Sequence, residues 1–209
     1  GRGSAPHTTI DPIVQAAQLV MSLQTIVSRE IKPIDPAVVT VGSIHGGTKH
    51  NIIGNECDLQ LTVRSYSESV RQKVLSAIQR KAKAVAASFD APPPEITISE
   101  GTPSLRNDDD LTARLKKVFE STLGTDKVSV DEPSMGGEDF SRYGREGVPI
   151  LMYRLGSVNQ SRLDRFKALG VPAPSLHSSQ YYPDVEPTLT TGILTMTGAA
   201  LELLRKDQQ

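Results

Sequence analysis

One histidine of this chain, His177, stands in a polar turn of the kind that presents a side chain to a ligand. It lies in the segment 174–179 (Pro-Ser-Leu-His-Ser-Ser), after a proline-rich loop. Imidazole is the commonest metal ligand and general base among protein side chains. No other His, Cys or carboxylate stands at metal-ligand spacing from it in the sequence. His177 is therefore either an ordinary loop residue or one part of a larger catalytic site.

A glycine-rich turn and an arginine form a second candidate site. Gly47 belongs to a glycine pair, which allows a ligand to approach the backbone closely. Asn51 follows with a side-chain amide, and Arg64 offers a planar pair of donors that matches a carboxylate. The alternative interpretation is a glycine-rich hairpin turn with a surface arginine.

A third group of residues places two glycines before two acids in the segment 135–140 (Met-Gly-Gly-Glu-Asp-Phe). At the start of a helix this arrangement could form the rim of an active site. The alternative is a loop that leads into a capped helix, because acidic side chains are stabilised at a helix N-terminus in any case.

The elements that must position these residues divide into two parts, with a boundary near residue 105. In the first part, Asp11 and Ser67 are good N-caps, and Pro12 suits the first position of a helix. The order of elements matches an α+β, ferredoxin-like split βαβ sandwich, whose exposed sheet edge favours pairing with a second copy. Hydrophobic periodicity predicts helices at 12–30 and 68–89 and strands at 38–44, 57–65 and 95–100.

The second part, residues 106–209, alternates expected strands and helices. Such alternation suits a portion of an α/β domain and is too short to make a complete one. The residues predict helices at 107–124, 138–143 and 188–205, a helical turn around 163–169, and strands at 128–130 and 148–155. The last helix carries the apolar residues Leu189, Ile193, Met196, Ala200 and Leu203.

Composition narrows the classes of function. The chain has 23 basic and 24 acidic residues, so it shows no electrostatic footprint for nucleic acid. No apolar run approaches the ~18 residues of a membrane span, and no membrane partner is expected. The single cysteine, Cys57, leaves no pair for an internal disulfide and favours a reducing, cytoplasmic location.

In their order and spacing these groups resemble the M20 family of metallopeptidases and amidohydrolases. The subgroup most similar to the chain cleaves N-acyl amino acids such as hippurate. The resemblance covers nearly the whole chain. It is carried by Pro6-His7, Asp11-Pro12-Ile13, Gly46-Gly47-Thr48, Asn51, Arg64, Gly137-Glu138-Asp139-Phe140 and His177.

The resemblance implies a lid and dimerisation domain at 1–105, joined to the C-terminal portion of an α/β zinc-peptidase-like catalytic domain at 106–209. Asn51, Arg64 and Gly47 would bind the substrate, with the first two holding its free carboxylate. His177 would be the last metal ligand, for zinc or alternatively manganese, cobalt or nickel. The general-base glutamate is expected in an N-terminal segment outside this chain. The chain alone is therefore expected to be inactive and to retain no metal.

One departure from the family concerns residues 1–7. The chain reads Gly-Arg-Gly-Ser-Ala-Pro-His where the family has Gly-x-Gly-Gly-His-x-x-x-Pro-His. The histidine that would polarise the scissile carbonyl is thus missing, and His7 matches the other one. The leading prediction remains metal-dependent hydrolysis of the amide bond of N-acyl amino acids or short peptides by a homodimer. The alternative is a non-catalytic module for small-molecule binding or dimerisation.

Overall fold

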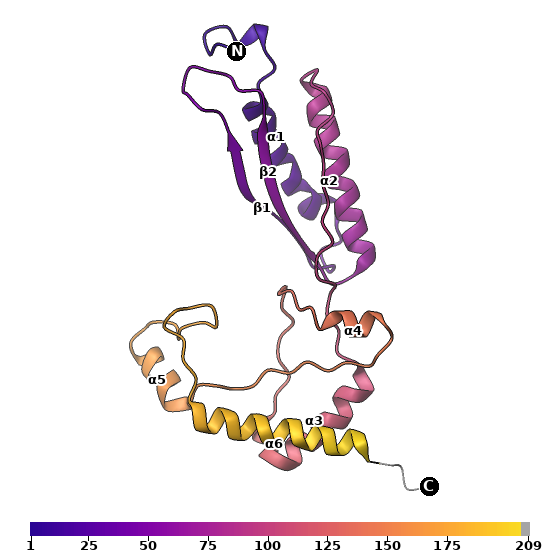
Figure 1. Cartoon of the computed structure of the whole chain (residues 1–209), viewed down its shortest axis with the longest axis vertical. Coiled ribbons are helices and arrows are strands. Elements are labelled where there is room, and N and C mark those ends of the chain that lie inside the picture. Colours follow the sequence, from indigo (N-terminus) through magenta and orange to yellow (C-terminus); the bar gives the residue numbers. More distant parts are fainter. Residues whose placement is uncertain (206–209) are drawn as a thin grey trace. The chain divides into compact units, whose positions relative to one another are not determined.

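The computed structural model describes residues 1–205, whose contacts form two compact units (Figure 1). Unit 1 consists of Gly1–Leu105 together with Ser134–Asp139. Unit 2 consists of Arg106–Pro133 and the residues from Phe140 onward. The short segment Ser134–Asp139 thus leaves the second half of the sequence and packs with the first. It includes both glycines and both acids of the third candidate group.

Unit 1 is α+β. Its two predicted caps are confirmed, since the Asp11 carboxylate accepts from the backbone of Ile13 at 2.9 Å and the Ser67 hydroxyl from Val70 at 3.2 Å. Both caps satisfy N–H groups that have no partner inside the helix. The elements are η1 (Pro6–Thr8), α1 (Pro12–Thr25), a π-helical turn η2 (Ile26–Glu30), β1 (Ala37–Gly46), β2 (Cys57–Ser65) and α2 (Glu68–Ser88).

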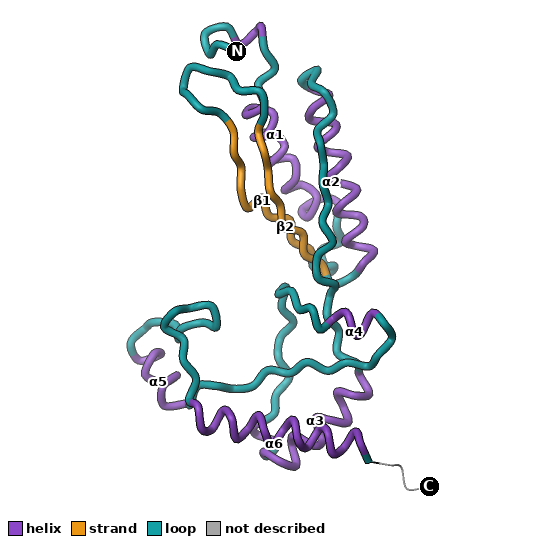
Figure 2. Tube along the Cα trace, viewed as in Figure 1, coloured by secondary structure: helices purple, strands orange, loops and turns teal. Residues whose placement is uncertain are grey.

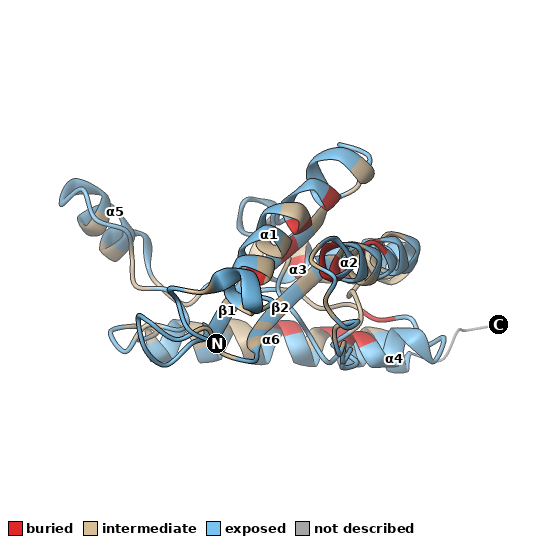
Figure 3. Ribbon diagram, turned by 90° about the horizontal axis from the view of Figure 1, so that it is seen from above, coloured by how far each residue is buried: buried red, intermediate tan, exposed pale blue. Residues whose placement is uncertain are grey.

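The two strands form an antiparallel hairpin covered by two helices. Gly46 pairs with Cys57 near the connecting loop, and Val38 pairs with Arg64 at the far end. Exposure alternates along β2, and α1 and α2 pack on the same face of the sheet (Figures 1 and 3). The core between helices and sheet is built on Leu23, Ile26, Ile31, Val39, Val74 and Ala77.

Unit 2 contains helices and loops (Figure 2). The Asp108 carboxylate caps α3 through the backbone N–H of Leu111 at 2.8 Å. Phe119 of α3 packs on Tyr153 with ring centroids 4.8 Å apart, and Leu115 and Ala199 complete this small core. The elements are α3 (Asp109–Leu123), η3 (Thr125–Lys127), α4 (Ser141–Arg145), α5 (Gln160–Ala168) and α6 (Val185–Leu204).

Three predicted strands, at 95–100, 128–130 and 148–155, do not form. Across residues 1–205, β1 and β2 make the sole sheet. A strand requires a backbone partner, and alternating hydrophobicity does not supply one. In the segment 148–155, the side chain of Asn107 supplies the partner that the backbone of a neighbouring strand would give. The Asn107 amide donates to the Met152 carbonyl at 2.9 Å and accepts from the Met152 N–H at 2.8 Å.

The last helix buries small residues and exposes several of its large apolar ones. Leu189, Ile193, Met196 and Leu203 are 46–63% exposed, whereas Thr195 and Ala199 are buried (Figure 3). Small residues bring α6 close to α3, since a Cβ on Gly198 would lie 3.1 Å from Val118 Cγ1. Packing against α3 therefore selects the small-residue face of α6. None of the helices in the described residues is both long and apolar enough to cross a membrane.

Candidate functional site

Arg64 stands next to the end of β2 and contacts a segment that is distant in sequence. A Cβ built on Gly137 would lie 2.7 Å from Arg64 Nη1 and 3.7 Å from Thr102 Oγ1. The guanidinium therefore rests against the backbone of the segment Ser134–Asp139. No pattern in the sequence marks Thr102, and the glycine pair at 136–137 is the one sequence signal for this contact.

The Arg64 side chain is exposed and keeps its donors available. Among the residues that the structure describes, no carboxylate forms an ion pair with it. A guanidinium offers two parallel N–H donors to a carboxylate, and such charge-assisted pairs are the strong ones. Arg64 is thus a cation on a backbone support, able to receive a carboxylate from outside the chain.

Gly47 and Asn51 lie in the loop that joins β1 to β2. Gly47 has a φ of +79°, a backbone conformation that favours glycine, and a Cβ there would stand 3.0 Å from Ile13 Cδ1. The loop is tied to the first residues of the chain. Gly3 N–H donates to the Asn51 carbonyl at 2.8 Å, and Ile53 N–H donates to the Gly1 carbonyl at 2.9 Å.

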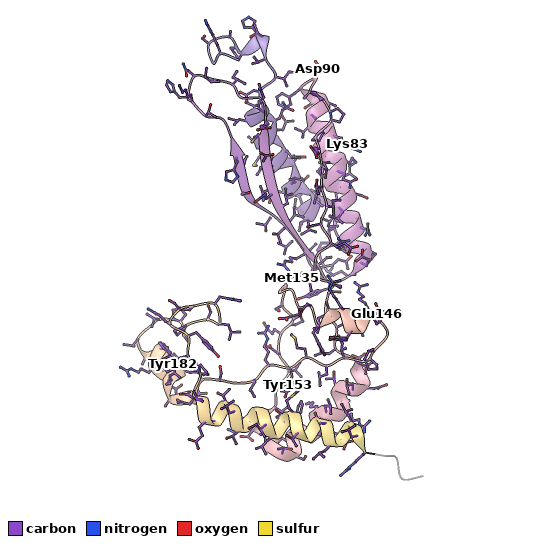
Figure 4. All side chains as sticks on the ribbon, in the orientation of Figure 1. Lys83, Asp90, Met135, Glu146, Tyr153 and Tyr182 are labelled. Atoms are coloured by element: carbon purple, nitrogen blue, oxygen red, sulfur yellow. The ribbon has the colours of Figure 1, made fainter. Side chains whose placement is uncertain are left out.

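The structure does not bring Asn51 and Arg64 together within one chain. The loop that carries Asn51 begins beyond the Gly46–Cys57 pair, whereas Arg64 lies seven residues along β2 from Cys57. At the usual rise of a strand these seven residues span about 23 Å. Met135 marks the segment that reaches the Arg64 end of the hairpin (Figure 4). One ligand of amino-acid size cannot touch both side chains of a single protomer.

His177 lies in the loop between α5 and α6, in unit 2, and its side chain is exposed. Two hydrogen bonds shape the loop around it, from Ser178 N–H to the Ser175 carbonyl at 2.9 Å and from Tyr181 N–H to the Ser178 carbonyl at 3.1 Å. Nowhere in residues 1–205 do three or more His, Cys, Asp or Glu residues gather in a way that could hold a metal ion. The described residues therefore do not fit a complete metal centre.

Cys57 is no candidate nucleophile. Burial raises the pKa of its thiol, and the nearby carboxylates of Asp58 and Asp11 raise it further. Because the thiolate is the reactive form of cysteine, these surroundings disfavour the form that a nucleophile needs. Its interpretation as a small strand residue agrees with its place in β2.

Comparison with known proteins decides the family. A peptidase dimerisation domain, the M20 dimerisation model, matches residues 1–90. Thermostable carboxypeptidase 2 from Saccharolobus solfataricus is 32% identical over 206 residues, which cover 99% of this chain and 49% of the relative. The chain belongs to the M20 family of peptidases and amidohydrolases. It spans about half the length of the curated relatives that it matches.

Further M20 relatives differ in what they are described to do. An N-acetyldiaminopimelate deacetylase from Lactococcus lactis is 34% identical over 163 residues, covering 78% of this chain and 43% of the relative. Among solved structures, YXEP of Bacillus subtilis, described as a dinuclear metal-binding peptidase from the M20 family, aligns with a TM-score of 0.66 at 22% identity. The alignment covers 95% of this chain and 48% of that protein. At this identity the likeness establishes the fold.

Proposed function

We propose that this chain serves a metal-dependent hydrolase that cleaves the amide bond of N-acyl amino acids or short peptides. Arg64 would hold the free carboxylate of the substrate. The observation that carries the proposal is the exposed Arg64 guanidinium, supported by the backbone at Gly137 and unpaired with any carboxylate of the described chain. Holding the carboxylate places the amide bond for attack, which removes orientational freedom before the reaction.

The two parts of the chain would have different roles. Residues 1–105 would be the lid and dimerisation domain, with a ferredoxin-like arrangement, and residues 106–209 the C-terminal portion of the catalytic domain. The match of residues 1–90 to a dimerisation domain supports a homodimer. Because Asn51 and Arg64 lie at opposite ends of one hairpin, Asn51 would reach a bound substrate only from the partner protomer of such a dimer.

His177 would supply one ligand to a divalent ion, zinc in the first instance. The dinuclear metal binding stated for the B. subtilis relative supports this assignment. A single exposed imidazole does not hold such an ion, so the remaining ligands would come from outside the described residues. What this chain's own residues contribute is binding and orientation: Arg64 holds a carboxylate, and the hairpin loop presents Asn51.

The proposal is tested by comparing a substrate with and without its carboxylate. In the full-length protein we would measure hydrolysis of N-benzoylglycine and of N-benzoylglycinamide, in which an amide replaces the carboxylate. Arg64→Ala should raise KM for the acid by roughly 10- to 100-fold, the range of a charged hydrogen bond. The same variant should leave KM for the amide nearly unchanged. Lys83→Ala, which removes an exposed cation from α2, is the matched control.

Two outcomes would contradict this assignment. Equal effects of Arg64→Ala on both substrates would show that Arg64 does not read the carboxylate. Failure of the unmodified full-length protein to hydrolyse either substrate would remove N-acyl amino acids as the substrate class. The His177 assignment has its own test, since His177→Ala should lower the metal content of the full-length protein.

The family match also favours dimerisation as an activity of unit 1 in its own right. The sheet has two strands, so β1 and β2 each have one edge that pairs with no other strand of the described residues. We expect the 209-residue chain to dimerise, which light scattering after size exclusion would show as twice the monomer mass. A monomer throughout the micromolar range would contradict this role.

A further inference from the structure

The His177 loop belongs to an excursion of the chain that is closed at its base. Asp184 N–H donates to the Ser157 carbonyl at 2.7 Å, and the hydroxyl oxygens of Ser157 and Tyr181 lie 2.6 Å apart. Residues 157–184 therefore form one lobe, which contains α5 and the loop that follows it. His177 lies within this lobe, between α5 and the closing contacts.

Arg162 of α5 spans the lobe. Its Nη1 lies 3.0 Å from Asp184 Oδ1, and its two terminal nitrogens lie 3.4 and 3.3 Å from the Tyr182 carbonyl oxygen. Its Cζ also stands 3.9 Å above the centroid of the Tyr182 ring. Figure 4 shows Tyr182 beside α5. The Arg162 side chain thus contacts the carbonyl and ring of Tyr182 and the carboxylate of Asp184 at the end of the loop.

Asp184 completes the connection between the two helices. Although it is the N-cap residue of α6, its side chain does not cap that helix. Instead, Asp184 Oδ2 accepts from the backbone N–H of Asn159 at 2.6 Å, at the start of α5. The Asn159 side chain in turn accepts from Arg162 N–H at 2.9 Å. The starts of α5 and α6 are therefore fastened to each other through Asp184.

We propose that Arg162 is a positioning residue that holds the backbone of the loop carrying His177 in one conformation. Two successive backbone hydrogen bonds order the loop. The first joins Ser178 to Ser175, and the second joins Tyr181 to Ser178. Arg162 anchors the next residue, Tyr182, and so fixes the end of this series. The inference concerns the order of the loop, and it does not depend on the reaction proposed above.

Arginine suits this position better than lysine. Its planar guanidinium stacks on an aromatic ring while its edge donates several hydrogen bonds, and lysine can replace only the charge. The variant Arg162→Lys should retain the attraction to Asp184. It should lose the simultaneous stacking on the Tyr182 ring and hydrogen bonding to the Tyr182 carbonyl. A graded series of variants therefore distinguishes the geometry of the side chain from its charge.

The test uses the imidazole signals of the four histidines in NMR spectra of the 209-residue chain, with His177→Gln to assign the signal of interest. The unmodified chain should give one narrow His177 signal. Arg162→Ala should broaden or split it, with little change for His7, His45 and His50, which lie in unit 1. Arg162→Lys should give an intermediate spectrum. Arg165→Ala, which removes an exposed arginine of the same helix, should resemble the unmodified chain.

Chymotryptic cleavage gives a second readout. The loop contains Leu176, Tyr181 and Tyr182, and its cleavage should accelerate roughly tenfold in Arg162→Ala if the lobe opens locally. A single narrow His177 signal and an unchanged cleavage rate in Arg162→Ala would overturn the proposal.

If Arg162→Ala unfolds unit 2, a further pair of variants at Tyr182 tests the proposal with Arg162 in place. Tyr182→Phe keeps the ring under the guanidinium, whereas Tyr182→Leu removes it. We expect the Phe variant to retain the narrow His177 signal and the Leu variant to broaden it. Equal spectra for the two would show that the stack on Tyr182 does not order the His177 loop.

Discussion

The guanidinium of Arg64 lies against the backbone of Gly137, where a Cβ would stand 2.7 Å from Nη1. This contact joins the end of β2 to a segment far along the sequence, within unit 1. It also makes the position of the proposed carboxylate anchor depend on a residue that has no side chain.

Gly137→Ala should therefore impair recognition of the substrate carboxylate. The added methyl group would displace the Arg64 guanidinium and weaken, without abolishing, a charged hydrogen bond. We expect KM for N-benzoylglycine to rise roughly 3- to 10-fold in the full-length protein, a fraction of the loss on removing Arg64. Gly136→Ala is the matched control, because a Cβ there would meet only Ser134 Oγ at an ordinary 3.6 Å. Equal effects of the two variants would contradict the explanation.

Asn107→Ala should destabilise unit 2. The substitution removes both side-chain partners of the Met152 backbone and leaves an N–H and a carbonyl unpaired. The free energy of unfolding should fall by about 1–3 kcal/mol. Asn107→Asp should retain an acceptor for the Met152 N–H but lose the donor. Urea denaturation measures both, with the exposed Asn55→Ala as the control. A neutral Asn107→Ala would show that the Met152 groups find other partners.

Glu30 should stabilise unit 1 in a pH-dependent way. Hydrogen bonds from Arg80 and Lys81 lower the pKa of the Glu30 carboxyl. A lowered pKa in the folded state gives stability that is present above the unfolded pKa, about 4.3, and lost as the pH falls through the folded value. Because these side chains are partly exposed, Glu30→Gln should cost only about 0.5–1 kcal/mol at pH 7.

The acid limit provides the check on this prediction. In urea denaturation, the difference between the unmodified chain and Glu30→Gln should begin to shrink as the pH falls below the unfolded pKa, about 4.3, and should vanish once the carboxyl is protonated in the folded state as well. The exposed Glu95→Gln should show no such trend. A difference that stays constant from pH 7 to pH 3 would mean that the ion pairs are not its source.

Leu23→Ala should produce the largest loss of stability among these variants. Leu23 is fully buried in the core of unit 1, so the substitution removes apolar contacts and leaves a cavity. The expected loss is about 2–5 kcal/mol. Met21→Ala, on the same helix with 71% of its surface exposed, should change the free energy of unfolding by less than about 0.5 kcal/mol. Similar losses for both would contradict the packing described for α1.

The parts of the fold that sequence could predict are those set by local chemistry. Asp11 and Ser67 cap their helices as expected, because a cap needs only the backbone N–H groups that follow it. The strands predicted at 95–100 and 148–155 do not form, because a strand needs a neighbouring backbone to pair with and alternating hydrophobicity does not show whether one is present. The buried face of α6 depends on its contact with α3, which selects small residues over large apolar ones.

In the candidate site, too, the local features were predictable from sequence and the long-range contacts were not. Asn51 was expected in a turn and Arg64 at a strand end, and the structure places both there. Their separation follows from the hairpin register, which sequence patterns fix only approximately. The contact of Arg64 with Gly137 was not predictable, since it depends on a distant segment folding back onto unit 1.

The large apolar side chains that α6 leaves uncovered determine how the isolated chain behaves in solution. Leu189, Ile193 and Met196 form a surface that water wets poorly, with 59–63% of each residue exposed. Salts that are excluded from protein surfaces should therefore precipitate this chain at modest concentration, and environment-sensitive dyes should fluoresce on binding it. Colloidal solubility will thus set the practical conditions for every measurement on the isolated chain.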